Sequence, residues 1–296
     1  MKIVITGSLG HISKPLVKTL VAAKHNVTVV SSKPEREAEI IALGAEAAIG
    51  SVEDVNFLTK TFKGADAVYT MTPPNFAAQD QKAYYELVGK NYAEAIKASG
   101  VKNVVNLSSM GAHMPEGCGP VSGAFRVEQT LNQLQGVNII HLRPGSFYTN
   151  FFNNIGMIKH MGFIGNNWGA TTKHVMSDTD DIAEVAAHEL QKLSYHGKNI
   201  AYVISDEKTP EKIAQILGKA IGKPDLKWVD IKDEDTIAGM IQAGVPTEMA
   251  KSLTEMGVAM RTGQMAAHFN KHRPTRFHKT KLEDFAPTFA AVYANQ

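Results

Sequence analysis

The chain has 296 residues, with 31 Lys and Arg against 29 Asp and Glu, a hydrophobic fraction of 44% and 20% charged residues. A chain of this length buries a core without disulfides or metals, and its composition excludes collagen, coiled coil and wholesale disorder. The net charge of +2 argues against nucleic-acid binding by the molecule as a whole.

The cysteine count and the apolar runs indicate a compartment. Cys118 is alone and has no internal disulfide partner, which suits a reducing environment, and no cationic residue flanks it to activate the thiol. The apolar run Ile3-Val4-Ile5 is too short for a signal peptide, and no later run approaches the roughly 18 residues of a membrane span. We therefore expect a soluble cytoplasmic protein, a monomer or homodimer, that binds neither membrane nor nucleic acid.

Short β-branched runs alternate with longer helical patterns through the first half of the chain. This alternation is typical of βαβ units around a parallel sheet, and residues 77–98 repeat apolar and tyrosine side chains at helical spacing. The pattern predicts an α/β fold with a Rossmann-type, doubly wound parallel sheet. Its strands are expected at 2–6, 26–31, 45–49, 65–71, 101–108 and 137–142.

A glycine-rich turn follows the first predicted strand. Gly7 allows a tight turn, and Gly10 lets the backbone approach a pyrophosphate lying on the N-terminus of the next helix. Ser13 stands where a third glycine is usual, and Pro15 requires the helix to begin no earlier than about His11. The position of the turn indicates dinucleotide binding; the alternative is an ordinary βα turn that binds nothing.

The end of the second predicted strand indicates which dinucleotide binds. NAD sites commonly place Asp or Glu here for the ribose 2′-hydroxyl, whereas this chain has Ser31-Ser32-Lys33 followed by Arg36. Hydroxyl groups and positive charge suit a 2′-phosphate. NADP(H) is therefore favoured over NAD(H), and a solvated helix start beside Glu35 is the alternative.

The alternation weakens after Arg143-Pro144, and Phe, Asn, Gly and Trp residues crowd together over 145–169. We predict a Rossmann domain over 1–150, with parts of 174–204 contributing to it, and a smaller α+β substrate lobe over 151–296. The elements expected after the boundary are a helix over 178–193, a strand at 199–204, a helix opened by Thr209-Pro210-Glu211, and a last helix with a capping box formed by Thr280 and Glu283.

Taken together, the motifs resemble the NmrA-like family of atypical short-chain dehydrogenase/reductases, which includes NAD(P)H:quinone reductases and redox-sensing regulators. The resemblance rests on the order and spacing of several segments spread along the chain. These segments are Thr6-Gly7-Ser8-Leu9-Gly10, Leu107-Ser108-Ser109-Met110-Gly111-Ala112, Glu128-Gln129 with Leu131, Leu142-Arg143-Pro144-Gly145-Ser146-Phe147 with Asn150, and Asp180-Asp181-Ile182-Ala183.

The resemblance implies a set of cofactor contacts. It places the pyrophosphate on the glycine turn, the 2′-phosphate at the end of the second strand, and the rest of the cofactor along later strand ends. Ser51 falls at the adenine end of the cofactor, where the chain departs from its relatives, which often carry Asp after the glycine. The implied contacts are Gly7, Leu9, Gly10, His11 and Ile12; Ser32, Lys33 and Arg36; and Met71, Thr72, Pro73, Ser108, Ser109, Gly145 and Ser146.

The catalytic pair of ordinary short-chain dehydrogenases is missing. Those enzymes use Tyr-x-x-x-Lys, in which lysine lowers the tyrosine pKa for proton exchange with the substrate, but none of the eight tyrosines here has a lysine four residues later. We therefore expect hydride transfer to an acceptor that needs little protein acid, such as a quinone-like or other small planar carbonyl compound. The alternative is a non-catalytic NADP(H) redox sensor that binds a protein partner.

The candidate proton donors are Ser109, His113 and Tyr148, each of which also suits a turn or strand edge. The predicted substrate pocket offers flat apolar surface to a planar ring, although an interdomain core would have the same composition. Its residues are Met110, Phe147, Tyr148, Phe151, Phe152 and Trp168, together with Met71.

Two further patterns carry no predicted site. His268 and His272 lie four residues apart, but Phe269 stands where a zincin has its Glu, so we predict no metal. The stretch 271–281 carries five basic residues and no acid, and we interpret it as a surface loop in preference to a nucleic-acid contact.

Overall fold

In the computed structural model, which describes residues 1–75 and 77–296, one large parallel sheet forms the centre of the larger part of the molecule. Its strands are β1 (Lys2–Ile5), β2 (Asn26–Ser31), β3 (Glu46–Ile49), β4 (Ala67–Met71), β5 (Asn103–Leu107), β6 (Asn138–Pro144) and β10 (Lys198–Val203). Their order across the sheet is β10-β6-β5-β4-β1-β2-β3. The order reverses between β1 and β4, which is where doubly wound sheets bind ligands, and the prediction of a Rossmann-type parallel sheet is confirmed.

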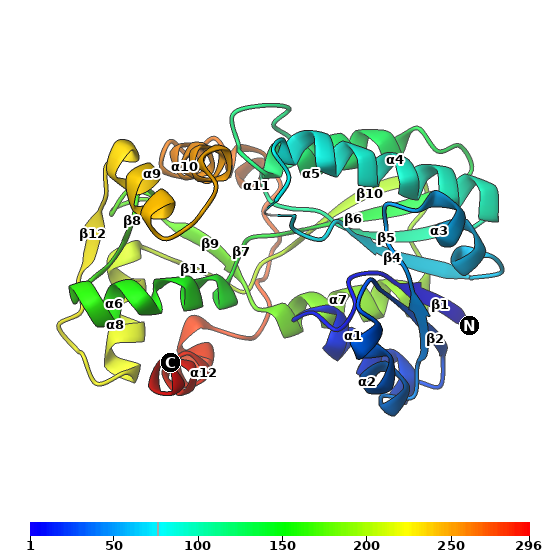
Figure 1. The fold of residues 1–296 in the computed structure, drawn as a ribbon, viewed down its shortest axis with the longest axis horizontal. Coiled ribbons are helices and arrows are strands. Elements are labelled where there is room, and N and C mark those ends of the chain that lie inside the picture. Colours follow the sequence, from blue (N-terminus) through cyan, green and yellow to red (C-terminus); the bar gives the residue numbers. More distant parts are fainter. Residues whose placement is uncertain (76) are drawn as a thin grey trace.

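Helices cover both faces of this sheet (Figure 1). One face carries α1 (Ser13–Ala22), α2 (Glu37–Ala42) and α7 (Thr179–Lys192), and the other carries α3 (Val55–Phe62), α4 (Gln81–Ser99) and α5 (Val121–Asn132). Successive side chains of a strand point to opposite faces. Accordingly Ile3 and Ile5 pack in the first core, whereas Val4 packs in the second.

A smaller lobe follows β6. It contains two small sheets, β11-β9-β7 and β12-β8, and a core of its own built from aromatic and aliphatic side chains. Its elements are β7 (Ser146–Phe147), α6 (Ile155–Met161), β8 (Ile164–Asn166), β9 (His174–Ser177), β11 (Asp206–Lys208), α8 (Pro210–Ala220), β12 (Trp228–Asp230), α9 (Asp233–Gln242), α10 (Thr247–Arg261), α11 (Ala267–Lys271) and α12 (Leu282–Asn295), together with a 3-10 helix at Tyr148–Asn154. A second 3-10 helix, Pro34–Arg36, lies in the larger part of the molecule, between β2 and α2.

The chain returns from the lobe to the main sheet. The predicted helix over 178–193 is α7, which packs against α1, and the predicted strand at 199–204 is β10, which pairs in parallel with β6. Residues 179–203, which belong to the segment 174–204 that was expected to contribute to the Rossmann domain, therefore lie with the sheet. Within the described residues, no helix has both the length and the hydropathy needed to cross a membrane.

The two predicted helix starts in the lobe had different outcomes. Thr209 caps α8, because its hydroxyl accepts the N–H of Lys212 at 3.4 Å, as predicted. The capping box predicted for Thr280 and Glu283 is wrong by one residue: Asp284 accepts the N–H of Lys281 at 2.8 Å. The cause is a competing bond, since the Thr280 hydroxyl donates to buried Asp181 at 2.9 Å.

Candidate dinucleotide and acceptor site

The turn after β1 needs a glycine at position 7. Gly7 has φ +94°, and a Cβ there would lie 2.8 Å from both Met71 Cγ and Ser13 Oγ. The N–H of Ser8 donates to the Val30 carbonyl at 3.0 Å, which fixes the turn to β2. At Gly10 a Cβ would meet only the Gly7 carbonyl oxygen, at 3.3 Å. The backbone fold therefore depends on Gly7, whereas Gly10 keeps the space above the turn open.

The start of α1 presents free backbone donors beside this turn. Its first helical residue is Ser13, so Pro15 falls in the first turn and the predicted limit at His11 is confirmed. The Ser13 hydroxyl donates to the Thr6 carbonyl at 3.1 Å, which accommodates serine at the third glycine position. Within the described chain, the N–H groups of His11 and Ile12 find no acceptor. Free N–H groups at a helix N-terminus bind anions, so this turn fits the pyrophosphate of a dinucleotide.

The end of β2 lies directly beside the turn. Ser8 Oγ donates to Ser31 Oγ at 2.9 Å, and Ser32 and Lys33 are exposed. Arg36 binds the carboxylate of Glu39 at 2.5 Å, and Lys14 of α1 binds the same carboxylate at 2.7 Å. Lys14 was not among the predicted site residues. Lys14 and Glu39 are 25 residues apart in the chain, so only the packing of α1 beside α2 brings them together.

Met71 brings the end of β4 to the same turn. Its N–H donates to Thr6 Oγ1 at 2.9 Å, and its carbonyl accepts the Tyr92 hydroxyl at 2.6 Å. Thr72 and Pro73 follow it, both half-buried. The structure therefore brings the predicted residues of β1 and β4 together, and Tyr92 is an additional residue that positions Met71.

A buried ion pair occupies the ends of β5 and β6. Arg143 donates to Glu128 through Nε at 2.9 Å and through Nη2 at 2.5 Å, and Ser108 Oγ donates to Glu128 Oε1 at 2.5 Å. Arg143 is 3% exposed and Glu128 1%. The Ser108 hydroxyl is thus committed to the ion pair, and Ser109 Oγ donates to the Met110 carbonyl at 3.0 Å.

Gly145 and Ser146 join the sheet to the lobe. A Cβ at Gly145 would lie 2.3 Å from the Val175 carbonyl oxygen, and its N–H donates to Ser177 Oγ at 2.8 Å. Ser146 pairs with Met176 of β9. The glycine is therefore required by the strand packed against it, whatever contact it makes with a cofactor.

The predicted pocket residues divide between cores and half-buried positions. Tyr148, Phe151 and Met110 are buried, and the Tyr148 hydroxyl donates to the Thr280 carbonyl at 3.0 Å. Burial raises the pKa of Tyr148, and this phenol belongs to the lobe core, which was the alternative interpretation. Four predicted residues are half-buried: Met71, Phe147, Phe152 and Trp168.

The remaining proton-donor candidate, His113, lies against a second histidine. Its ring centroid is 5.7 Å from that of His268, whose Nδ1 lies 2.7 Å from the Tyr202 hydroxyl oxygen. Burial lowers the pKa of His113. Cys118 is fully buried, and burial raises the pKa of its thiol to about 12, so it offers no reactive thiolate.

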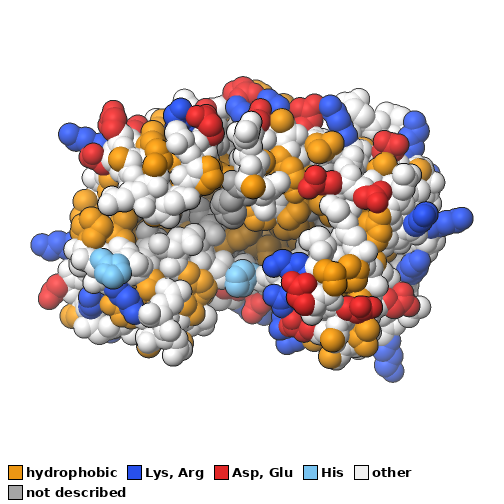
Figure 2. All heavy atoms as spheres, viewed as in Figure 1, with side chains coloured by type: hydrophobic (Ala, Val, Ile, Leu, Met, Phe, Trp, Pro, Cys, Tyr) orange, Lys and Arg blue, Asp and Glu red, His pale blue; other side chains and the backbone are white. Residues whose placement is uncertain are grey.

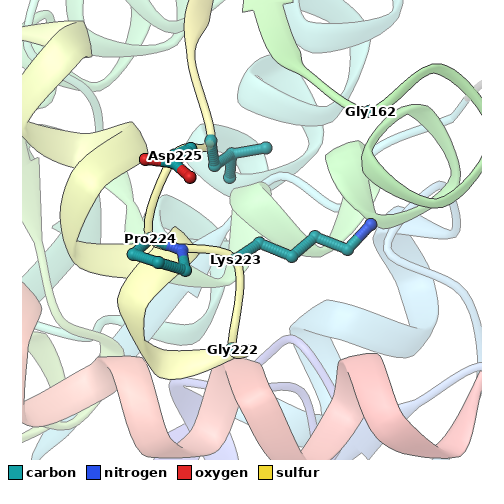
Figure 3. A pocket seen from close by; sticks show the side chains of 6 residues that line it. Gly162, Gly222, Lys223, Pro224 and Asp225 are labelled. Atoms are coloured by element: carbon teal, nitrogen blue, oxygen red, sulfur yellow. The ribbon is translucent and has the colours of Figure 1, made fainter.

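All strands of the main sheet are parallel, and β6 continues directly into β7 of the lobe, so the carboxyl ends of the strands face the lobe. The space-filling view shows a depression between the two parts, with hydrophobic side chains on its floor (Figure 2). A separate open hollow of about 400 Å³ lies on the lobe, lined by Gly162 and the loop 222–226 (Figure 3). That hollow carries no aromatic ring, which makes it a poor site for a planar acceptor.

Comparison with known proteins identifies a family and several similar reductases. The model of the NmrA-like family matches residues 1–284. A (4-alkanoyl-5-oxo-2,5-dihydrofuran-3-yl)methyl phosphate reductase of Streptomyces griseus is 25% identical over 90% of this chain and 89% of its own length. Among solved structures, the Citrobacter sp. triphenylmethane reductase complexed with NADP(H) has a TM-score of 0.80 at 20% identity, covering 97% of this chain and 99% of that one. An NADPH-dependent quinone oxidoreductase of Escherichia coli complexed with NADPH has a TM-score of 0.78 at 19% identity, with the same coverage. With nearly the whole chain matched by the family model, this protein belongs to the NmrA-like family.

Proposed function

We propose that the protein is an NAD(P)H-dependent oxidoreductase that reduces a small planar acceptor, quinone-like or with another conjugated carbonyl group. The observation that carries the proposal is the turn after β1, where Gly7 is required by its surroundings and α1 presents free N–H groups. Family membership and the reductases among the relatives support it. They favour a reductase over a silent redox sensor.

NADP(H) is the cofactor that the residues at the end of β2 suit best. Ser32 and Lys33 are exposed there, and Arg36 is half-exposed, so hydroxyl and cationic groups surround the position of a 2′-phosphate. Two similar structures hold NADPH or NADP(H). NADH is expected to bind more weakly, because it lacks the phosphate that these groups would contact.

The side chains at the strand ends explain the choice of acceptor. A bound reduced nicotinamide supplies a hydride, and the chain holds the pyrophosphate on the turn while the lobe covers the strand ends. Ser108 donates to Glu128, and Tyr148 donates to Thr280 in the lobe core. Neither hydroxyl is free to donate to an acceptor oxygen. An acceptor whose reduced oxygen takes its proton from water suits such a site, and quinones have this property.

The decisive assay follows NADPH absorbance with purified protein and a panel of quinones and conjugated carbonyl compounds, with NADH in parallel. We expect acceptor-dependent oxidation that is faster with NADPH at subsaturating cofactor. Tight NADPH binding without NADPH oxidation in the presence of any acceptor would contradict the reductase proposal and favour the non-catalytic redox sensor.

Two glycine variants test the cofactor site itself. Gly10→Val should abolish NADPH binding while keeping the fold, because its side chain enters the open space above the turn. Gly7→Ala should instead lower the free energy of unfolding by at least about 1–2 kcal/mol, because alanine is strained at φ +94° and its Cβ contacts Met71 and Ser13. Fluorescence titration and denaturant unfolding measure the two effects. Unchanged NADPH affinity in a folded Gly10→Val protein contradicts the site.

A further inference from the structure

A three-residue ion cluster lies between α1 and α2. Glu39 accepts from Lys14 Nζ at 2.7 Å with one carboxylate oxygen and from Arg36 Nη1 at 2.5 Å with the other. The side chains are partly exposed, at 42% for each cation and 36% for Glu39. The bonds from Lys14 and then Arg36 hold the pKa of Glu39 below its usual value, so the carboxylate is charged at neutral pH.

The cluster flanks the place where the ribose end of a dinucleotide meets β2. Lys14 follows the glycine turn directly, and its N–H donates to the Gly10 carbonyl at 3.0 Å. Arg36 ends the short 3-10 helix after β2, and the bond between Ser8 and Ser31 holds the turn against the end of that strand. In doubly wound folds the ribose 2′-position is read at this end of the second strand.

The charges of the cluster match a phosphate. Lys14, Lys33 and Arg36 carry three positive charges and Glu39 one negative charge, so these four side chains together have a net charge of +2; Glu35 and Glu37 are exposed on the same segment. A phosphate monoester carries about −1.5 to −2 at neutral pH. Each carboxylate oxygen of Glu39 accepts a hydrogen bond from a cation. The carboxylate is therefore not free to accept hydrogen bonds from the ribose hydroxyls, as the acid of an NAD site does.

We propose that Lys14 is a further determinant of NADP(H) preference and that Glu39 is a counter-ion which the 2′-phosphate displaces from Lys14 and Arg36. This inference rests on the proposed function, because it requires the dinucleotide to lie on the glycine turn. Exposed ion pairs contribute little to holding side chains in place. Removing the charge of Glu39 therefore strengthens phosphate binding more than it disorders the two cations.

Equilibrium binding of 2′,5′-ADP and 5′-AMP isolates this effect, because the two nucleotides differ only in the 2′-phosphate. We expect Lys14→Met to weaken 2′,5′-ADP by about tenfold, as for loss of one charged hydrogen bond, and to change 5′-AMP affinity by no more than about twofold. Glu39→Gln should tighten 2′,5′-ADP by about threefold or more and leave 5′-AMP unchanged. Titration calorimetry at low salt measures both, and intact NADPH and NADH are titrated alongside.

Matched controls lie on the same two helices. Lys18 of α1 and Glu37 of α2 are exposed, and Lys18→Met and Glu37→Gln should change the ratio of the two affinities by less than twofold. Equal effects of Lys14→Met and Lys18→Met, or weaker 2′,5′-ADP binding by Glu39→Gln, overturn the inference. If the wild-type protein binds the nucleotides and the ratio does not respond to Lys14, only this inference fails. If it binds neither NADPH nor NADH, the proposed function fails with it.

Discussion

His174 of β9 is a buried imidazole without a hydrogen bond. It is 2% exposed, its ring centroid lies 4.8 Å from that of Trp168 and 6.3 Å from that of Trp228, and neither ring nitrogen has a partner among the described residues. Burial lowers its pKa from 6.5 to about 4. The folded protein therefore holds this side chain neutral where the unfolded chain would bind a proton.

This depressed pKa makes stability depend on pH. Above about pH 6.5 the histidine is neutral in both states, and as the pH falls toward 4 only the unfolded chain gains the proton, so acid destabilises the fold. Replacing His174 by Phe removes the titrating group and keeps an aromatic ring against the two tryptophans. Relative to wild type, His174→Phe should gain about 3 kcal/mol between pH 7 and pH 4. Urea unfolding across this range measures the difference, and parallel pH profiles for the two proteins would contradict it.

Single residues were predictable where the backbone alone dictates them. The requirement for Gly7 and the tolerance of Ser13 follow from the strand-turn-helix pattern, and the structure contains both features. The sequence analysis named Glu128 and Arg143 only as parts of family motifs. Their ion pair was not predicted, because it forms between two separate elements, α5 and β6. Likewise Lys14 has no local pattern, since its partner Glu39 lies on another helix.

At the scale of elements, Asp181 fastens α7 to the last part of the chain. It is 1% exposed, and it accepts hydrogen bonds from the Ser205 hydroxyl at 2.7 Å and the Thr280 hydroxyl at 2.9 Å. The backbone N–H of Thr280 also donates to it, at 3.2 Å. Three donors therefore depend on one carboxylate that is buried between the sheet and the start of α12.

Loss of this carboxylate should be costly. Asp181→Ala leaves the Ser205 and Thr280 donors without an acceptor and should lower the free energy of unfolding by about 3 kcal/mol. Its neighbour Asp180, which is exposed in the first turn of the same helix, is the matched control, and Asp180→Ala should cost less than about 1 kcal/mol. Urea unfolding measures both values, and a similar decrease in the free energy of unfolding for the two variants would contradict the role of Asp181 in holding α7 to the start of α12.

The strands of the main sheet were predictable to within two residues at each end. Most of them are rich in β-branched residues and flanked by turn residues, whereas β3 (Glu46–Ile49) has only one β-branched residue. The short strands of the lobe, such as β8 and β12 with three residues each, are too short to show a period of two. Aromatic crowding over 145–169 showed that Tyr148 and Phe151 pack against something, but composition alone does not separate a pocket from a core. The structure places both side chains in the lobe core.

At the scale of the whole molecule, the sheet and the lobe are joined at several points. Ser177 accepts the Gly145 N–H and donates to the Val203 carbonyl, and Tyr202 of β10 meets His268 of α11. In the basic stretch 271–281, Lys279 binds Glu184 of α7 beside the sheet, whereas Arg273 binds Glu207 of β11 within the lobe. This stretch therefore pairs with acids that lie elsewhere in the chain.

These links predict a single unfolding transition. Both tryptophans, Trp168 and Trp228, lie in the lobe, so tryptophan fluorescence reports the lobe, whereas far-UV circular dichroism reports the whole chain. We expect the two signals to change at the same urea concentration. A fluorescence transition that precedes the loss of helical signal would show that the lobe unfolds alone.

The position of β10 has a consequence for how the protein is made. β10 lies beside β6 in the sheet, yet the chain between them contains β7 to β9, α6 and α7. On the ribosome, β6 therefore emerges first and remains an unpaired edge until that whole intervening segment has been synthesised. Unpaired edges invite association between nascent chains. Substitutions that slow the folding of this segment should reduce the yield of soluble protein even when the finished molecule is as stable as before.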